Sequence, residues 1–269
     1  MTHAVSSHLI RNHRLTVDWL GRLSRAGIDL VELFLARQSV DYRDPAQIAE
    51  LATWFRDHEL RLHSIHLPMR SDDLVINIAE PDRVSRRKTV DELKRALEMT
   101  EQTPCPFAIQ HIGLGQDSHD DRKFDAAYRV LEELNVFAHD RGVEILLENI
   151  PNELSSGAKL RKFVETTHLK NGFCFDTGHA NVMEGVEPAF EAMADRIRST
   201  HVHDNDGVND IHLFPYLAQG VTIDWRKTME LLRSRADQYP LLLELREHSD
   251  IADPIGAIQE VFSRLEDER

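Results

Sequence analysis

Carboxylates and imidazoles stand at the carboxyl ends of several short, strand-like segments of this sequence. Four of them combine three acidic side chains with one histidine: Glu148, Asp176, His201 and Glu244. Groups of this kind are costly to bury unless they are paired or bound to a cation. Together they form a ligand set for a divalent metal and leave coordination positions for the oxygens of a substrate. The pattern therefore predicts one shared metal site, with four unrelated helix caps and turn residues as the alternative.

A second group of polar residues follows other strand-like segments or lies in nearby loops. It comprises four histidines and one aspartate: His66, His111, His179, Asp210 and His212. Histidine is the commonest metal ligand in proteins, so these residues predict additional metal ions. The alternative is a polar pocket in which the imidazoles hydrogen-bond the hydroxyl groups of a substrate.

Residues this far apart in the chain can form one site only if the fold brings their strands together. Short runs with strand propensity alternate with longer amphipathic stretches of helical period. The predicted strands cover residues 4–9, 29–35, 60–66, 107–112, 143–148, 172–176, 199–203 and 241–245. The predicted helices cover residues 15–26, 45–58, 82–101, 121–141, 157–167, 188–197, 224–235 and 254–264. Eight such units predict an α/β fold, a single (β/α)8 barrel domain over residues 1–269, whose strand ends converge on one face.

An open doubly wound sheet is the structural alternative, but it normally has fewer units and a single switch-point crevice. Two stretches, 68–81 and 204–222, carry no regular pattern. Long loops within a compact domain tend to be functional. We expect the first to act as a lid and the second to present Asp210 and His212 to the site.

The overall charge limits the classes of partner. Acidic residues outnumber basic ones, 46 to 32, and the formal net charge is −14. This balance opposes binding to nucleic acid or to an acidic membrane. Only two cysteines are present, in no metal-binding spacing, and no signal-peptide pattern or membrane-length apolar run is found. We therefore expect a cytoplasmic protein without a membrane partner; a homo-oligomer is left open.

Taken together, the motifs resemble those of the xylose isomerase-like TIM barrel superfamily, which includes sugar isomerases, sugar epimerases and endonuclease IV. The resemblance runs almost from end to end. It includes Asp29-Leu-Val-Glu-Leu33, Ser64-Ile-His-Leu-Pro68, Phe175-Asp-Thr-Gly-His179, His201-Val-His-Asp-Asn-Asp-Gly207, Asp210-Ile-His-Leu213 and Glu244. Two motifs depart from the usual pattern. A Gly-Glu-Gly turn is replaced by Tyr216-Leu-Ala-Gln-Gly220, and His-Pro-Gly by His111-Ile-Gly113.

The epimerase branch of this superfamily implies one metal ion held by Glu148, Asp176, His201 and Glu244. In that branch Glu148 and Glu244 would flank the reacting carbon, and His179 would bind the substrate. His203 competes with His201, because residues two apart on a strand point the same way. The strand-end position favours His203, and the resemblance favours His201.

The endonuclease IV branch implies up to three zinc ions and adds His66, His111, His179, Asp210 and His212 as ligands. All nine ligand types occur in this sequence. A zinc-dependent apurinic-site endonuclease is therefore the first alternative function. A non-catalytic sugar-binding barrel is the second, although a pure binding site has no need for two opposed bases.

From these observations we predict a metal-dependent isomerase or epimerase of a small sugar, a sugar phosphate or a polyol ketone. One divalent ion, with Mn²⁺ or Zn²⁺ favoured over Mg²⁺ or Co²⁺, would act as a Lewis acid on the substrate. Glu148 and Glu244 would move a proton through an enediolate, with His179 beside its oxygen.

Overall fold

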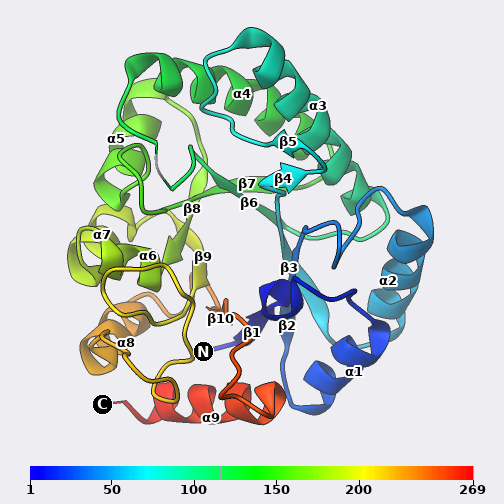
Figure 1. The fold of residues 1–269 in the computed structure, drawn as a ribbon, viewed down its shortest axis with the longest axis vertical. Coiled ribbons are helices and arrows are strands. Elements are labelled where there is room, and N and C mark those ends of the chain that lie inside the picture. The colour runs from blue at the N-terminus through cyan, green and yellow to red at the C-terminus, as the bar shows by residue number, and fades with distance from the viewer. Residues whose placement is uncertain (116, 269) are drawn as a thin grey trace.

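A ring of parallel strands surrounded by helices forms the molecule (Figure 1). The computed structural model describes residues 1–115 and 117–268. The eight-stranded sheet has the order β10-β1-β2-β3-β6-β7-β8-β9. Its two ends are joined by hydrogen bonds from the Val202 amide to the Leu242 carbonyl (2.8 Å) and from the Glu244 amide to the Val202 carbonyl (3.2 Å). These bonds close the ring and confirm the predicted (β/α)8 barrel.

The barrel strands coincide with the eight predicted runs, with shifts of a few residues at their ends. The largest shift is in the first run, which continues as a 3-10 helix, Ser7–Ile10, because the Ser6 hydroxyl accepts a hydrogen bond from the His8 amide and turns the chain. The strands are β1 (His3–Ser6), β2 (Leu30–Phe34), β3 (Arg61–His66), β6 (Phe107–His111), β7 (Glu144–Glu148), β8 (Gly172–Asp176), β9 (Ile197–His201) and β10 (Leu241–Leu243).

The helices begin where the sequence provides caps. Asp44 accepts a hydrogen bond from the Ala46 amide (3.0 Å) ahead of the proline that opens α2, and Asp82 accepts one from the Ser85 amide (2.8 Å) at the start of α3. The helices are α1 (Val17–Arg25), α2 (Pro45–Asp57), α3 (Arg83–Glu98), α4 (Asp121–His139), α5 (Gly157–Thr167), α6 (Thr177–Val182), α7 (Val186–Met193), α8 (Trp225–Arg233) and α9 (Pro254–Asp267), with a 3-10 turn at Met99–Glu101.

The helices differ from the prediction in two places. The predicted helix 188–197 ends earlier, at Met193, because Ile197 already pairs with Phe173 as the first residue of β9. The short helix α6 was not predicted. It forms because the Asp176 side chain accepts a hydrogen bond from the His179 amide (2.6 Å) directly after β8.

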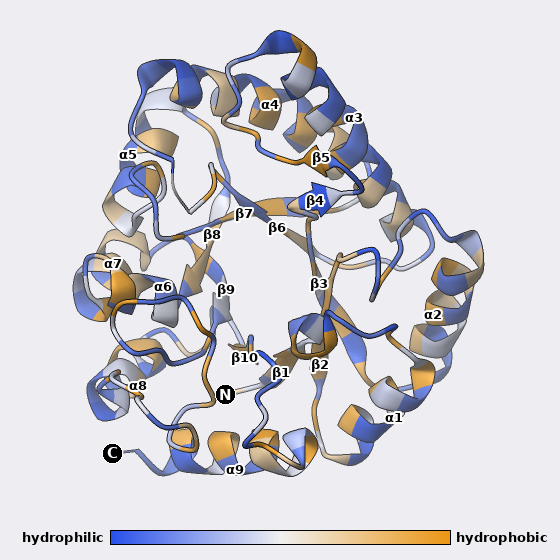
Figure 2. Ribbon diagram, in the orientation of Figure 1, coloured by the Kyte–Doolittle hydropathy of each residue, from blue (hydrophilic) through white to orange (hydrophobic). Residues whose placement is uncertain are grey.

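Apolar side chains fill the space between the strands and the helices, and Figure 2 shows the hydrophobic residues concentrated on the strands and on parts of the helices. Inside the ring a smaller cluster of Ile109, Leu146 and Cys174 packs with Phe107. This apolar layer lies below the strand ends that carry the polar groups. Within the described part of the chain, no helix is long and apolar enough to cross a membrane.

Segment 68–81, predicted to be irregular, contains a small antiparallel hairpin, β4 (Arg70–Ser71) with β5 (Leu74–Val75). The hairpin follows β3 at the end of the barrel where that strand's polar residue lies. It therefore borders the candidate site, and its proposed movement as a lid stays a prediction.

Helix α4 offers a direct test of which face supports the barrel. Leu134 is completely buried, whereas Val136 is 65% exposed on the same helix. We predict that Leu134→Ala lowers the free energy of unfolding by about 2–5 kcal/mol, because it leaves a cavity. The control Val136→Ala should change it by less than about 0.5 kcal/mol. Urea unfolding followed by circular dichroism measures both, and equal losses would contradict the packing described.

Candidate metal centre

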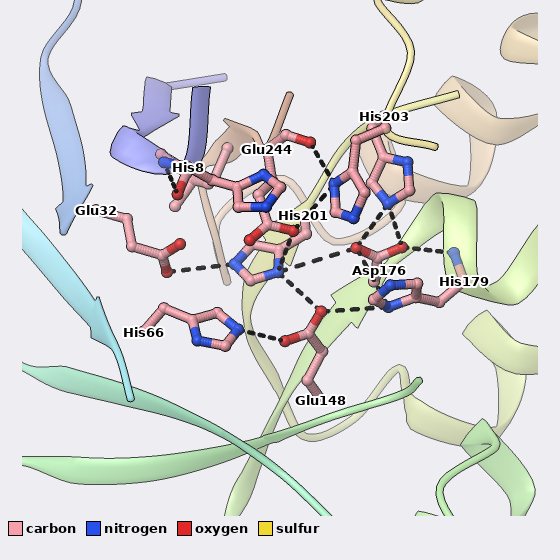
Figure 3. Close-up of polar contacts among 12 residues, drawn as sticks. His8, Glu32, His66, Glu148, Asp176, His179, His201, His203 and Glu244 are labelled. Atoms are coloured by element: carbon pink, nitrogen blue, oxygen red, sulfur yellow. Dashed lines mark hydrogen bonds and ion pairs between the residues drawn. The ribbon is translucent and has the colours of Figure 1, made fainter. Parts of the chain in front are cut away.

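The predicted polar residues lie together at the carboxyl ends of the barrel strands. His66, His111, Glu148, Asp176 and His201 are the last residues of β3, β6, β7, β8 and β9, and Glu244 directly follows β10. Parallel strands of a closed barrel bring these ends to one face. The structure therefore places residues separated by up to 178 positions in adjoining, largely buried clusters (Figure 3).

The ligand atoms of Glu148, Asp176, His201 and Glu244 all lie within 4.8 Å of one another. The His201 Nδ1 atom is 3.0 Å from Glu148 Oε1, 3.5 Å from Glu244 Oε2 and 3.9 Å from Asp176 Oδ2. All four side chains are buried. Three buried carboxylates around one imidazole nitrogen are a donor set that suits a divalent cation.

The surroundings of Glu148 and Glu244 give these two carboxyl groups different pKa values. Burial, together with the charge of Glu148, raises the pKa of Glu244 to about 7, although His201 acts in the opposite direction. Burial also acts to raise the pKa of Glu148, but the charges of His201 and His111 outweigh it and hold that pKa well below its usual range. Near neutral pH, in the absence of a metal, Glu148 is therefore ionised, whereas Glu244 takes up a proton readily.

A buried glutamate that was not singled out as a site residue fixes the orientation of His201. Glu32 on β2 lies 3.2 Å, through Oε2, from the His201 Nε2 atom, and the Ser64 hydroxyl donates to the same oxygen (2.7 Å). The Nε2–H group thus points to Glu32 and leaves Nδ1 facing the three carboxylates. A charged residue within the apolar run of β2 was the signal in the sequence.

The structure also separates the two candidate histidines. His201 lies close to all three carboxylates of Glu148, Asp176 and Glu244. The Nε2 atom of His203 approaches only one of them, that of Asp176 (3.1 Å). The His203 ring stacks on His212, with ring centroids 3.9 Å apart. Gly178 makes room for it, since a Cβ atom there would lie 2.0 Å from the His203 ring.

A second group of possible ligands shares Glu148. Its Oε2 atom is 2.8 Å from His111 Nε2 and 3.3 Å from His66 Nε2, while its Oε1 atom faces His201. Glu148 thus connects two ligand groups through its two oxygens. Glu148 would therefore be a ligand in either group.

A third group lies beside Asp176. Asp210 Oδ1 is 3.1 Å from His212 Nε2 and 3.4 Å from His179 Nε2, and His203 completes the group. His179 Nδ1 donates to the Asn149 carbonyl (2.9 Å). The structure therefore brings every residue of both predicted sets into adjoining clusters.

Main-chain carbonyls orient most of these imidazoles. In each case Nδ1–H donates to a carbonyl, and Nε2 is left facing the ligand groups. The pairs are His66 with Leu67 (3.0 Å), His179 with Asn149 (2.9 Å), His203 with Asp204 (3.2 Å) and His212 with Glu244 (2.9 Å). His8, which was not predicted as a site residue, also donates Nδ1–H to a carbonyl, that of Leu245 (3.1 Å), and it lies near His212 and Glu244, with Nε2 accepting from Arg11 (2.8 Å).

The loop 204–222 is held in place by Asp204. Its carboxylate accepts hydrogen bonds from the Thr222 amide (2.9 Å) and from the Trp225 indole (2.6 Å). His212 has a positive φ of 47°, a costly conformation for a non-glycine residue. The two departures from the family motifs are also stabilised: Tyr216 donates to Glu268 (3.0 Å), and the Ile112 carbonyl accepts from Asn152 (3.0 Å).

The clusters line a small pocket of about 130 Å³. Apolar residues and two arginines complete its wall around the candidate ligands. The lining residues are His8, Arg11, Phe34, His66, Met69, His111, Gly115, Glu148, Ile150, Pro151, His179, Asp210, His212, Glu244 and Arg246.

Comparisons with known proteins agree with this architecture. The chain is 25% identical over 170 residues to the uncharacterized protein y4fM of Sinorhizobium fredii, a match that covers 59% of this chain and about half (53%) of that protein. It is 31% identical over 112 residues to the probable endonuclease 4 of Natranaerobius thermophilus, covering 39% of each chain. The structure of a D-tagatose 3-epimerase-like protein superimposes with a TM-score of 0.78 and 23% identity, over 98% of this chain and 97% of the other.

At that identity the structural likeness concerns the fold. The sequence model of the family described as xylose isomerase-like TIM barrel matches residues 20–267, nearly the whole chain. The match includes all of the strand-end residues in the three clusters. The chain is therefore a member of the xylose isomerase-like TIM barrel family.

Proposed function

We propose that the protein is a divalent-metal-dependent isomerase or epimerase of a small sugar or sugar-like ketone. The observation that carries the proposal is the pair of carboxylates of Glu148 and Glu244, which approach His201 Nδ1 from β7 and from the end of β10. They lie in a pocket of only about 130 Å³. Two acid–base groups in so small a space suit proton transfer on a small molecule.

The donor set supports a resident divalent ion. Three carboxylates and one imidazole would hold it through Glu148, Asp176, His201 and Glu244. Buried carboxylates at this spacing repel one another unless a positive charge lies among them. When bound, such an ion polarises a carbonyl and acidifies the adjacent C–H bond.

The remaining chemistry belongs to the side chains. One glutamate would remove the carbon-bound proton and keep it, and the other, starting protonated, would donate its own proton to the opposite face or to the neighbouring carbon. His179 is held by Asn149 with Nε2 directed toward Asp210, so it would contact a substrate oxygen at the edge of the pocket. The fold relationship to a D-tagatose 3-epimerase-like protein supports this assignment.

A second candidate function is a zinc-dependent endonuclease acting at apurinic sites. It is favoured by the two additional ligand groups, around His111 and around Asp210, and by the similarity to a probable endonuclease 4. A formal charge of −14 and the small pocket oppose it, because a nuclease must hold a phosphate backbone and extrude the damaged site.

The first test removes each glutamate base. Glu148→Gln and Glu244→Gln should each lower turnover of a sugar substrate by about 10²–10⁴-fold, because each change deletes a proton-transfer group without emptying its space. The control is Glu247→Gln, an exposed glutamate three positions beyond Glu244. Turnover is measured in steady-state assays, and the metal content of each variant is measured in parallel. Near-native turnover by either site variant would exclude the two-base mechanism.

The second test is the pH dependence of metal binding. In the metal-free protein the pKa of Glu244 is raised to about 7 and that of His201 lies well above 6.5, so both hold protons at pH 6. A metal must displace them, and affinity should fall by about tenfold per pH unit for each displaced proton. Chelator competition from pH 8 to 5 measures this. A metal affinity of the wild-type protein that does not change with pH would contradict this prediction. The control His139→Gln, at an exposed position, should show the same pH dependence as the wild type.

The third test separates the two candidate functions. We expect no incision of a duplex that contains one abasic site, even with zinc supplied and at low salt, where phosphate binding is strongest. Incision that disappears in His111→Ala and in Asp210→Ala would replace the isomerase assignment with the nuclease. Cleavage that both variants retain would point to a contaminating nuclease.

A further inference from the structure

A group of arginines borders the candidate site on the side of strands β1 to β3. Arg11 follows β1, Arg37 follows β2, and Arg70 lies in the hairpin strand β4. We propose that this side of the site, defined by these three residues and called here the arginine annex, binds an anionic group of the substrate. The anion would be a phosphate ester or a carboxylate several bonds from the reacting carbons. This inference rests on the proposed function and specifies its substrate class.

Two adjoining hollows support the proposal. The metal-site pocket has a volume of about 130 Å³, below the roughly 300 Å³ at which ligand pockets usually begin. A neighbouring hollow of about 500 Å³ shares Arg11, Phe34 and Met69 with it. A substrate whose carbonyl end occupied the smaller pocket would therefore extend past these shared residues into the annex.

The charge of the annex favours an anion. Its lining contains three arginines and, among acidic residues, Asp72. Arg37 pairs with Asp72 and with Asp41 (3.2 Å), and Arg43 shares Asp72 (3.1 Å). In the part of the chain that the structure describes, no carboxylate pairs with Arg11 or Arg70. Among the described residues, Arg70 thus carries a charge that no ion pair neutralises, and Arg11 is influenced only by the more distant charges of Glu244 and Asp210, against that of Arg246.

Arg11 is also held in position. Its Nη1 atom donates to His8 Nε2 (2.8 Å), and His8 is itself fixed by the Leu245 carbonyl (3.1 Å). Arg246 provides a contrast, because it lines the same pocket but its guanidinium is occupied by the Asp210 carbonyl (2.8 Å) and carboxylate (3.4 Å). Arg11 therefore keeps donors free for a ligand, and a guanidinium binds phosphate or carboxylate oxygens in pairs.

The test compares neutral and anionic ligands on the metal-loaded, full-length protein by titration calorimetry. One pair is D-ribulose and D-ribulose 5-phosphate, and the other is L-sorbose and 5-keto-D-gluconate, which carries a carboxylate where L-sorbose has its terminal CH2OH group. We expect at least one anion to bind about tenfold more tightly than its neutral partner. Arg11→Gln and Arg70→Gln should each remove most of this advantage. The control Arg56→Gln, at an exposed position on α2, should retain it.

Each result has one interpretation. An advantage confined to the phosphate or to the carboxylate identifies the anion, whereas no advantage, or one that both variants retain, overturns the inference. Because Arg70 is exposed, its variant gives an answer even if Arg11→Gln fails to fold. Turnover of neutral sugars without an anion advantage would refute the annex alone. An arginine-dependent advantage without turnover of any sugar would refute the proposed function alone, and arginine-dependent binding of an abasic duplex would refute the small-molecule assignment.

Discussion

The rest of the site depends on the burial of the Glu148 carboxylate. One of its oxygens faces His111 and His66, and the other faces His201 and His179, all within 3.3 Å. A carboxylate without access to water is costly unless positive charge or hydrogen-bond donors surround it. The imidazoles supply those donors, and a cation at the adjoining cluster would supply the charge. Removing this one residue would therefore disconnect two of the ligand groups.

The barrel and the site are stabilised by the same backbone. The carbonyls that fix the histidines belong to residues at or just beyond strand ends: Leu67, Asn149, Asp204 and Glu244. Because the register between neighbouring strands sets the position of each carbonyl, it also sets which ring nitrogen faces the centre. His201 differs, since the Glu32 carboxylate on β2 orients it across the ring (Figure 3). A shift in the register of one strand would therefore displace both the ligand residue at its end and the carbonyl that orients a histidine.

Much of the fold and the identities of the clustered residues could be predicted from the sequence, because apolar runs mark the strands and most of the polar residues stand at the ends of those runs. The supporting roles of Glu32 and His8 could not be predicted in this way. Their partners are more than 160 positions away in the chain, and only the closed ring brings them into contact. Helix α6 was missed because its stability comes from the Asp176 cap rather than from helical periodicity. The choice of ring nitrogen likewise depends on carbonyl positions that no sequence pattern encodes.

We propose that a divalent ion binds among Glu148, Asp176, His201 and Glu244. The most direct measurement is anomalous X-ray diffraction on crystals of the protein loaded with Mn²⁺ or Zn²⁺. An ion held by this set should give an anomalous peak within coordination distance, about 2.0–2.3 Å, of all four side chains. A peak confined to the neighbouring histidine clusters, or no peak at saturating metal, would contradict it.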